Sequence, residues 1–320
     1  MNRSDRPAAS VTTIGARRFE WGARTYVMGI LNVTPDSFSG DGLLVGSAAL
    51  GAAAGDGPNL EATVERTIER ARRMIDEGAD LLDVGGESTR PGHGSVGEAE
   101  ELERVVPVVA ALHATFPEIP LSVDTTKPAV AAAALDAGAV LLNDVWGVAP
   151  DRAMGRLAAE RGVPIVLMHN RAEARYANLI VEILAELEAA VERTIADGVP
   201  VERIIVDPGF GFGKTPHHNL ALLADLDRLR LLGRPVLLGT SRKSTLGLVL
   251  DLPPEERVEA TLATTALAVR AGVDIVRVHD VGPNVRAARM ADAIVRGWGQ
   301  PGPGARPDPM SDRERPMSAR

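Results

Sequence analysis

The sequence contains no cysteine among its 320 residues. Disulfides, thiolate metal sites and a cysteine nucleophile are therefore excluded, and any metal must bind oxygen or imidazole groups. The sequence also lacks an uncharged apolar run of the roughly 18 residues that a membrane span needs. Its first residues, MNRSDRPAAS, lack the apolar core of a signal peptide. We therefore expect a soluble, cytoplasmic protein.

A surplus of positive charge is missing as well. Lysine and arginine total 35 against 43 aspartate and glutamate residues, and the net charge is -8. A protein that binds nucleic-acid phosphates electrostatically needs a basic surface, so we expect no nucleic-acid partner. The hydrophobic content of 45% is instead enough for a large core.

Short apolar runs rich in β-branched residues recur along the chain, and each ends near a polar residue. Consecutive apolar positions are typical of parallel strands that are covered on both faces. Segments with helical spacing lie between the runs, as in residues 59–78, where Leu60, Val64 and Ile68 share one face and Gly78 ends the helix. Strict alternation of eight strands with helices predicts an α/β fold, a single-domain (β/α)8 TIM barrel, with a doubly wound open sheet as the alternative. The expected strands are residues 25–32, 79–86, 120–125, 140–144, 164–169, 203–209, 235–241 and 274–280, and the later helices 98–112, 128–136, 151–161, 179–197, 217–232, 254–271 and 284–296.

Three regions fall outside this pattern. Residues 1–18 are expected to form a flexible N-terminal tail, and residues 299–320, which are rich in glycine, proline and charge, a disordered C-terminal tail. Residues 43–58 are rich in glycine and alanine and lengthen the first βα loop, so we expect a mobile surface insertion there. No internal repeat or linker marks a second domain, and the barrel is expected to occupy residues 19–298.

Polar side chains fall at the ends of the expected strands. In a barrel of this kind, the carboxyl ends of the strands and the loops after them form the active face. Any one of these residues could be a cap that hydrogen-bonds to the local backbone. Capping alone does not account well for so many polar residues at the same end of the strands. They are Asn32, Thr89, Arg90, Asp124, Asn143, His169, Asp207, Lys243, Arg277 and His279.

One set among them suits a flat, nitrogen-rich heterocycle. Asp124, Asn143 and Asp207 each follow a buried apolar run, and carboxylate and amide groups pair with the N–H groups and ring nitrogens of such a ligand. The following segment, DPGFGFGKT, is not a phosphate loop, because Pro208 stands where the motif GxxxxGK[ST] needs glycine. We interpret its glycines as shaping a loop beside Asp207, with Phe212 available to stack on a ring.

A second set is cationic. Lys243 follows the seventh expected strand, and Arg277 and His279 lie on the eighth, close to where barrels often bind phosphate. Arg277 and His279 are two residues apart and so share one side of the strand. A salt bridge between Arg277 and a neighbouring aspartate is the alternative. The segment GTSRK lacks the second glycine of a G-x-S-x-G elbow, which argues against covalent serine catalysis.

Eight segments together resemble the dihydropteroate synthase family of the folate pathway, over about residues 25–297. The segments are MGILNVTPDSFSGDG, DVGGESTRPG, LSVDTTKP, LLNDVWG, IVLMH, IIVDPGFGFGKT, GTSRKS and RVHD. The resemblance implies a (β/α)8 barrel that joins 6-hydroxymethyl-7,8-dihydropterin diphosphate to 4-aminobenzoate, giving 7,8-dihydropteroate and pyrophosphate. It also implies a homodimer and inhibition by sulfonamides that mimic aminobenzoate.

The resemblance further implies a role for each matching residue. The pterin would lie against Asp124, Asn143, Asp207 and Lys243, with Met168 and Phe212 packed near its ring. The diphosphate would bind Asn32, Arg277 and His279, and Asn32 would also contact Mg2+. The aminobenzoate would lie among Phe38, Thr89, Arg90, Pro91 and Ser244, with Asp36 in the same first loop. The catalytic residues would be Lys243, Arg277 and His279, which neutralise the leaving group, and Asp124, which shares the positive charge of the pterin.

Two departures from the family pattern stand out. The stretch between Gly42 and Asn59 is an addition to the first loop, and the segment after His169 enters the next helix quickly, so we expect a more open rim of the pterin pocket. One alternative function is a pterin-binding methyltransferase, which has no diphosphate to hold. Another is a non-catalytic pterin-binding protein that has kept the pocket and lost turnover.

Overall fold

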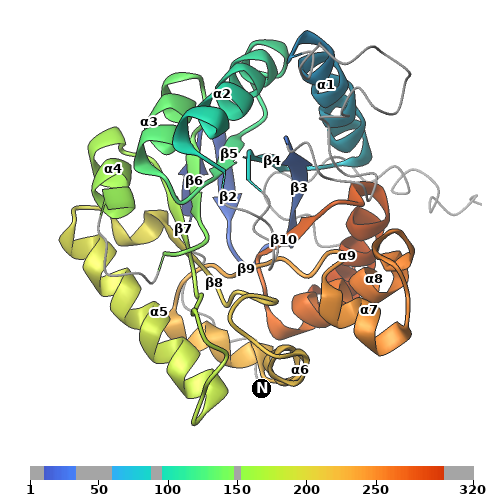
Figure 1. Cartoon of the computed structure of the whole chain (residues 1–320). Helices are drawn as coiled ribbons and strands as arrows, with labels where there is room; N and C mark the ends of the chain where they lie inside the picture. The colour runs from blue at the N-terminus through green and yellow to red at the C-terminus, as the bar shows by residue number, and fades with distance from the viewer. Residues whose placement is uncertain (1–10, 34–59, 88–95, 148–152, 299–320) are drawn as a thin grey trace, which may run out of the picture.

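Eight parallel strands form the centre of the molecule. The computed structural model describes residues 11–33, 60–87, 96–147 and 153–298. The strands are β3 (Tyr26–Asn32), β4 (Leu81–Gly85), β5 (Leu121–Asp124), β6 (Leu141–Asp144), β7 (Ile165–Met168), β8 (Ile204–Asp207), β9 (Leu237–Leu238) and β10 (Ile275–Val278). They form one sheet in the order β8-β7-β6-β5-β4-β3-β10-β9, which curls into a barrel (Figure 1). A parallel bridge between Val206 and Val236, just before β9, joins the two ends of the sheet. The predicted (β/α)8 barrel is confirmed.

Helices surround the barrel, and their positions follow the prediction with four differences. The predicted helix at residues 217–232 is divided at Asp225 into α6 and a 3-10 helix, η4, and residues 254–271 form a short 3-10 helix, η5, before α8. The other two differences are η3 and α7, which were not predicted. The bounds are α1 (Leu60–Glu77), α2 (Glu98–Thr115), α3 (Pro128–Asp136), α4 (Ala153–Arg161), α5 (Leu179–Ala196), η3 (Val201–Arg203), α6 (Pro216–Ala224), η4 (Leu226–Leu232), α7 (Ser244–Leu250), η5 (Pro254–Glu256), α8 (Val258–Ala271) and α9 (Val281–Arg296).

The core has two main parts because the barrel strands are covered on both faces. One cluster fills the space between strands and helices, and includes Leu31, Leu82 and Val105. The other combines inward-facing strand residues, such as Met28 and Ile205, with residues that precede the barrel. Side chains rather than a channel therefore fill the amino end of the barrel, as is usual for this fold.

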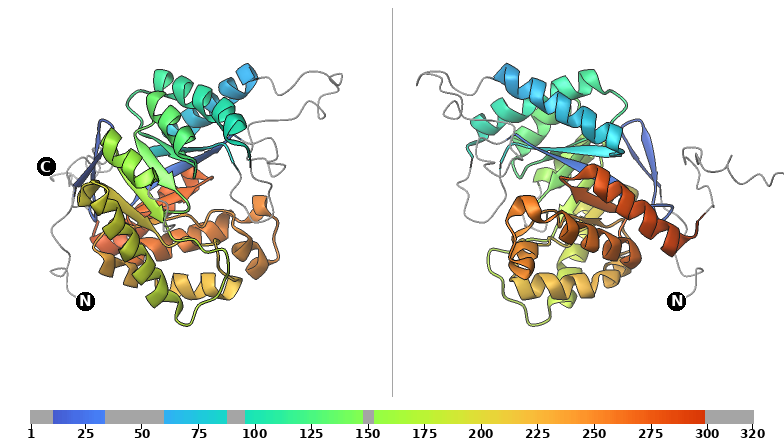
Figure 2. Two further views of the ribbon diagram at one scale, coloured as in Figure 1. Left: turned by 60° about the vertical axis from the view of Figure 1, so that its left-hand side comes forward. Right: turned by 90° about the vertical axis from the view of Figure 1, so that its right-hand side faces the viewer.

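An N-terminal hairpin covers this end of the barrel. The strands β1 (Val11–Ile14) and β2 (Arg17–Glu20) pair antiparallel, and Figure 2 shows the hairpin at one end of the barrel. Ile14, Phe19 and Trp21 are buried in the inner cluster, where the rings of Phe19 and Trp21 stack at 5.6 Å. The predicted flexible tail at residues 1–18 is therefore wrong for residues 11–18, because their apolar side chains close the open end of the core.

Several predicted regions lie outside the described residues. These are the first ten residues of the predicted N-terminal tail, the predicted insertion at residues 43–58 and the predicted tail at residues 299–320. In the part of the chain that the structure describes, no helix combines the length and apolarity needed to cross a bilayer.

Candidate active site

The strand register brings the predicted polar residues to one level of the barrel. Asp124 is the register partner of both Gly85 and Asn143, and Gly85 is also the partner of Asn32. Register partners on parallel strands point to the same side of the sheet. A Cβ at Gly85 would lie 3.6 Å from the Cβ of Asp124 and 3.9 Å from Oδ1 of Asn32, so these two residues flank a strand end that carries no side chain.

Arg277 forms two ion pairs inside this ring of residues. Its Nε donates to Oδ2 of Asp83 at 2.6 Å, and its Nη2 donates to Oδ2 of Asp124 at 2.7 Å. Arg277 therefore forms the salt bridge that was the alternative for this residue. The two carboxylates together hold the guanidinium in place.

Asp83 is a site residue that the sequence analysis missed. It is fully buried on β4, and the same oxygen that binds Arg277 also accepts a hydrogen bond from Nδ2 of Asn143 at 2.9 Å. Since a carboxylate only accepts, the Asn143 amide must direct its NH2 group at Asp83. A charged residue in the middle of the apolar run LLDVG was the available signal.

Asp124 combines burial with an unused hydrogen-bonding oxygen. Burial raises the pKa of its carboxyl to about 7, a shift that Arg277 opposes and the nearby charge of Asp83 reinforces. Its Oδ1 is buried and has no hydrogen-bond partner among the described residues. A buried carboxylate oxygen without a donor is unfavourable, so this atom is suited to accept an N–H from a ligand.

Lys243 lies beside the glycine-rich loop after β8. Its Nζ donates to the carbonyl oxygen of Phe210 and stands 3.9 Å from the centre of the Phe212 ring. Burial lowers the pKa of Lys243 to about 7, opposed by the negative charge of Asp207. Burial likewise raises the pKa of Asp207, whose Oδ1 accepts a hydrogen bond from the Gly209 N–H at 2.7 Å. The structure thus brings Asp207, Phe212 and Lys243 close together.

His279 is oriented by Ser241, which lies in the turn after β9. Its backbone N–H donates to Oγ of Ser241 at 3.1 Å, and its ring Nδ1 lies 3.0 Å from the same oxygen. Met168, at the end of β7, is buried and is the register partner of Asp207, whereas Ser244 begins α7 and is exposed. The remaining predicted site residues, Asp36, Phe38, Thr89, Arg90 and Pro91, lie outside the described residues.

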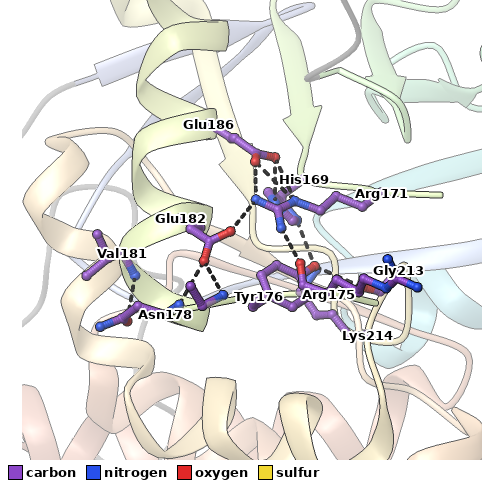
Figure 3. Close-up of polar contacts among 11 residues, drawn as sticks. His169, Arg171, Arg175, Tyr176, Asn178, Val181, Glu182, Glu186, Gly213 and Lys214 are labelled. Carbon is purple, nitrogen blue, oxygen red and sulfur yellow. Dashed lines mark hydrogen bonds and ion pairs between the residues drawn. The ribbon is translucent and has the colours of Figure 1, made fainter. Parts of the chain in front are cut away.

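A second polar network lies behind the Phe212 loop, and sequence reasoning missed most of it (Figure 3). Lys214 contacts His169 at the end of β7, and His169 contacts Glu186 of α5. His169 is fully buried, and its pKa is lowered to about 4, chiefly by burial and secondly by the charge of Lys214. The imidazole is therefore neutral at pH 7.

Comparisons with known proteins agree with this arrangement. The family model described as "Pterin binding enzyme" matches residues 28–279. Dihydropteroate synthase of Clostridium beijerinckii is 48% identical over 284 residues, covering 88% of this chain and 99% of the relative. A crystal structure of dihydropteroate synthase from Clostridium difficile in the presence of pteroic acid has a TM-score of 0.78 and 46% identity, covering 87% of this chain and 99% of the other. That of Xanthomonas albilineans with 4-aminobenzoic acid has a TM-score of 0.79 and 40% identity, covering 89% and 98%. The chain therefore belongs to the pterin-binding enzyme family and, within it, to the dihydropteroate synthases.

Proposed function

We propose that the polar carboxyl end of the barrel is where the chain condenses 6-hydroxymethyl-7,8-dihydropterin diphosphate with 4-aminobenzoate to give 7,8-dihydropteroate and pyrophosphate. The main observation behind this proposal is that the buried residues Asp124, Asn143 and Asp207 lie together near the cations Lys243 and Arg277. Related structures whose titles name pteroic acid and 4-aminobenzoic acid support the choice of ligands.

The carboxylates and the amide suit the pterin ring. The free Oδ1 of Asp124 can accept a ring N–H, and Asn143, whose amide nitrogen is turned to Asp83, keeps its carbonyl oxygen for a further donor. Asp207 offers a second carboxylate beside Met168. The ring of Phe212 would then pack against the flat face of the heterocycle, next to Lys243.

The cations suit the leaving group. An aniline nitrogen is already neutral at pH 7, so the protein has little acid or base chemistry to perform. The main task is to stabilise the departing pyrophosphate and the positive charge that its departure leaves on the pterin methylene group. Lys243, Arg277 and His279 would stabilise the negative charge of the departing pyrophosphate. The carboxylate of Asp124 would stabilise the positive charge on the pterin.

We also propose that Mg2+ acts with the diphosphate at Asn32. Among the described residues, no group of three or more His, Cys, Asp or Glu side chains is placed to hold a metal. Mg2+ commonly combines one or two protein oxygens with substrate phosphates, and Oδ1 of Asn32 flanks the open end of β4 at Gly85. When bound, the ion would neutralise charge on the leaving diphosphate.

The aminobenzoate site is proposed from the family motif, at Asp36, Phe38, Thr89, Arg90, Pro91 and Ser244. Ser244 is exposed at the start of α7, directly after Lys243, and this position supports the proposal. Sulfonamides carry the same para-substituted aniline, and we propose that they compete for this position.

A homodimer is proposed because exposed apolar side chains occur on α7, α8 and α9. These three helices lie near one another in the ribbon (Figures 1 and 2). Large exposed apolar surfaces commonly mark protein interfaces, and a two-fold dimer buries the same patch on both copies. The residues are Leu248 and Val249 of α7, Leu267 of α8, Met290 and Ile294 of α9, and Trp298 just beyond it.

A magnesium titration of turnover tests the proposed diphosphate site. Chelation of Mg2+ should abolish pyrophosphate release, and re-addition should restore it. Asn32→Ala should need a higher Mg2+ concentration for half-maximal rate, with turnover recovering at saturating metal because the substrate phosphates supply most ligands. A metal requirement unchanged by Asn32→Ala would remove this residue from the site.

A further inference from the structure

Lysine is rare in this chain, and its three occurrences share one location. Of 35 lysine and arginine residues, only Lys127, Lys214 and Lys243 are lysines. All three follow barrel strands, after β5, β8 and β9 respectively. Lysine differs from arginine in having a compact charge with three donors rather than a planar fork. Lys243 belongs to the proposed pocket and Lys127 pairs with Glu87 and Glu101, which leaves Lys214 without an explained role.

The acceptors around Lys214 match the three N–H groups of an ammonium. Its Nζ lies 3.0 Å from the carbonyl oxygen of Gly209, 3.1 Å from that of Phe212 and 3.0 Å from Nδ1 of His169. A neutral amine has only two N–H groups, so one of the three acceptors would lose its donor. Because Nδ1 of His169 accepts, the ring proton resides on Nε2.

The His169 ring connects Lys214 to a network of charged residues that includes Glu182 and Glu186 of α5. Nε2 of His169 lies 3.1 Å from Oε2 of Glu186, and Glu186 is paired with Arg171, which also donates to Glu182 at 2.8 Å (Figure 3). The interactions with Arg171 lower the pKa of Glu186 and oppose the effect of its burial, so Glu186 is an anion at pH 7. The chain of contacts from Lys214 therefore ends on a fixed negative charge.

The loop that Lys214 holds is also the loop that contacts Lys243. The carbonyl oxygen of Phe210 and the ring of Phe212 both face Nζ of Lys243. At Gly209, with φ +68°, a Cβ would lie 1.8 Å from the carbonyl oxygen of His169, so the loop backbone runs directly against the end of β7. Lys214 thus holds the loop on one side while Lys243 lies on the other.

We infer that Lys214 is a positioning residue for the transfer reaction: its ammonium ties the Gly209–Lys214 loop to the end of β7 and thereby sets Phe212 and Lys243 for the pterin. The inference rests on the proposed pterin contacts of Phe212 and Lys243. Burial lowers the pKa of Lys214 to about 7, and the negative charge of Asp207 opposes this effect. The three acceptors around Nζ favour the ammonium form against burial.

Chemical rescue at position 214 tests the inference, and the absence of cysteine makes it selective. Lys214→Cys introduces the sole thiol of the chain. Alkylation of that thiol with 2-bromoethylamine in denaturant, followed by refolding, restores a lysine-like side chain with a terminal ammonium. Alkylation with 1-bromopropane gives a side chain of the same length without charge or donors. Lys214→Met provides a genetic counterpart, and wild-type protein taken through the same treatment controls for refolding.

We expect Lys214→Met and the propyl form to lose about 10²-fold in kcat/KM for the pterin diphosphate, as for other small misplacements of reacting groups. The loss should appear mainly in the KM for the pterin diphosphate and in kcat, with the KM for 4-aminobenzoate little changed. The aminoethyl form should recover most of the activity. Arg175→Met removes an exposed charge from the segment after β7 and should leave the kinetics unchanged, because the Arg175 side chain pairs with Glu173, which is itself exposed.

Three results would overturn the inference. These are wild-type kcat/KM in Lys214→Met, equal activity of the aminoethyl and propyl forms, or a propyl form that does not fold, which would assign Lys214 to stability alone. Lys243→Met separates this question from the proposed function. An inactive Lys243→Met together with a fully active Lys214→Met would reject only the role of Lys214.

Discussion

At the scale of single residues, the site is built from charges that are held away from water. Asp124 and Lys243 have pKa values shifted toward each other, both to about 7, and burial is the main cause for each. Such opposed shifts are common in active sites, where groups are placed for chemistry rather than for stability. The sequence predicted these residues because each follows a strand, but not Asp83, whose importance arises from contacts with two residues far away in the chain.

The first prediction concerns Lys243. Lys243→Met should lower kcat by about 10²-fold or more, because it removes a fixed charge that faces the leaving group. The same variant should be more stable than the wild-type protein at pH 7, since a buried ammonium is replaced by an apolar chain of similar length. Steady-state kinetics and urea unfolding measure the two effects, and near wild-type turnover would contradict the proposed role.

The stability difference should also depend on pH in a defined direction. The folded-state pKa of Lys243 is about 7 against an ordinary value of 10.5, so between these values the unfolded chain binds more protons than the folded chain. The destabilisation due to Lys243 is therefore complete below about pH 7 and disappears as the pH rises toward 10.5. The advantage of Lys243→Met should shrink across that interval, and an advantage that grows with pH would show that burial is not its cause.

At the scale of elements, the pattern of apolar residues predicted the strands and helices of the barrel. It failed where contacts between distant parts of the chain determine which residues are buried. All eight barrel strands were predicted because their residues are apolar on consecutive positions. The buried face of α1 consists of Thr63, Thr67, Ala71 and Met74, whereas the predicted face started from Leu60. Thr67 can be buried because its hydroxyl donates to the Thr63 carbonyl oxygen at 2.8 Å. The β1–β2 hairpin was missed for a similar reason. The polar residue Thr12 can be buried because its hydroxyl accepts a hydrogen bond from the Trp21 indole N–H and donates one to the Glu202 carbonyl oxygen.

The glycine loop after β8 gives the second prediction. Gly209→Ala should abolish most turnover and destabilise the fold, because a Cβ there would overlap the carbonyl oxygen of His169 and the residue has φ +68°. Gly233→Ala is the matched control, with φ +61° but nothing within 4 Å of the added carbon. The control should lose only about 1–2 kcal/mol of stability from backbone strain and keep its activity. Urea unfolding and kcat should thus separate the two variants, and similar behaviour would argue against tight packing of this loop.

At the scale of the whole molecule, one end of the barrel is closed for stability and the other is open for chemistry. The hairpin closes the amino end with Phe19 and Trp21, while the polar residues gather at the carboxyl end. Strand alternation predicted where the polar residues gather, because the carboxyl ends of all parallel strands meet at one face. Patterns within the chain predicted neither the hairpin nor the proposed partner surface, since both depend on which faces are left uncovered after the barrel has closed.

The third prediction concerns that partner surface. Met290 and Ile294 are exposed one turn apart on α9, so Met290→Asp with Ile294→Asp should place two charges in the proposed interface and give a monomer. Val181→Asp alters an equally apolar exposed residue on α5, on a different side of the barrel (Figure 1), and should leave the dimer intact. Sedimentation velocity distinguishes the two. A wild-type monomer, or a dimer that tolerates both charges on α9, would contradict the proposed interface.

The fourth prediction tests the central claim most directly. Pyrophosphate release from 6-hydroxymethyl-7,8-dihydropterin diphosphate should be measured with Mg2+, with and without 4-aminobenzoate, while dihydropteroate is quantified in parallel. The site described above predicts release that depends on the amine and equals the dihydropteroate formed. Tight pterin binding without matching pyrophosphate and dihydropteroate would contradict it.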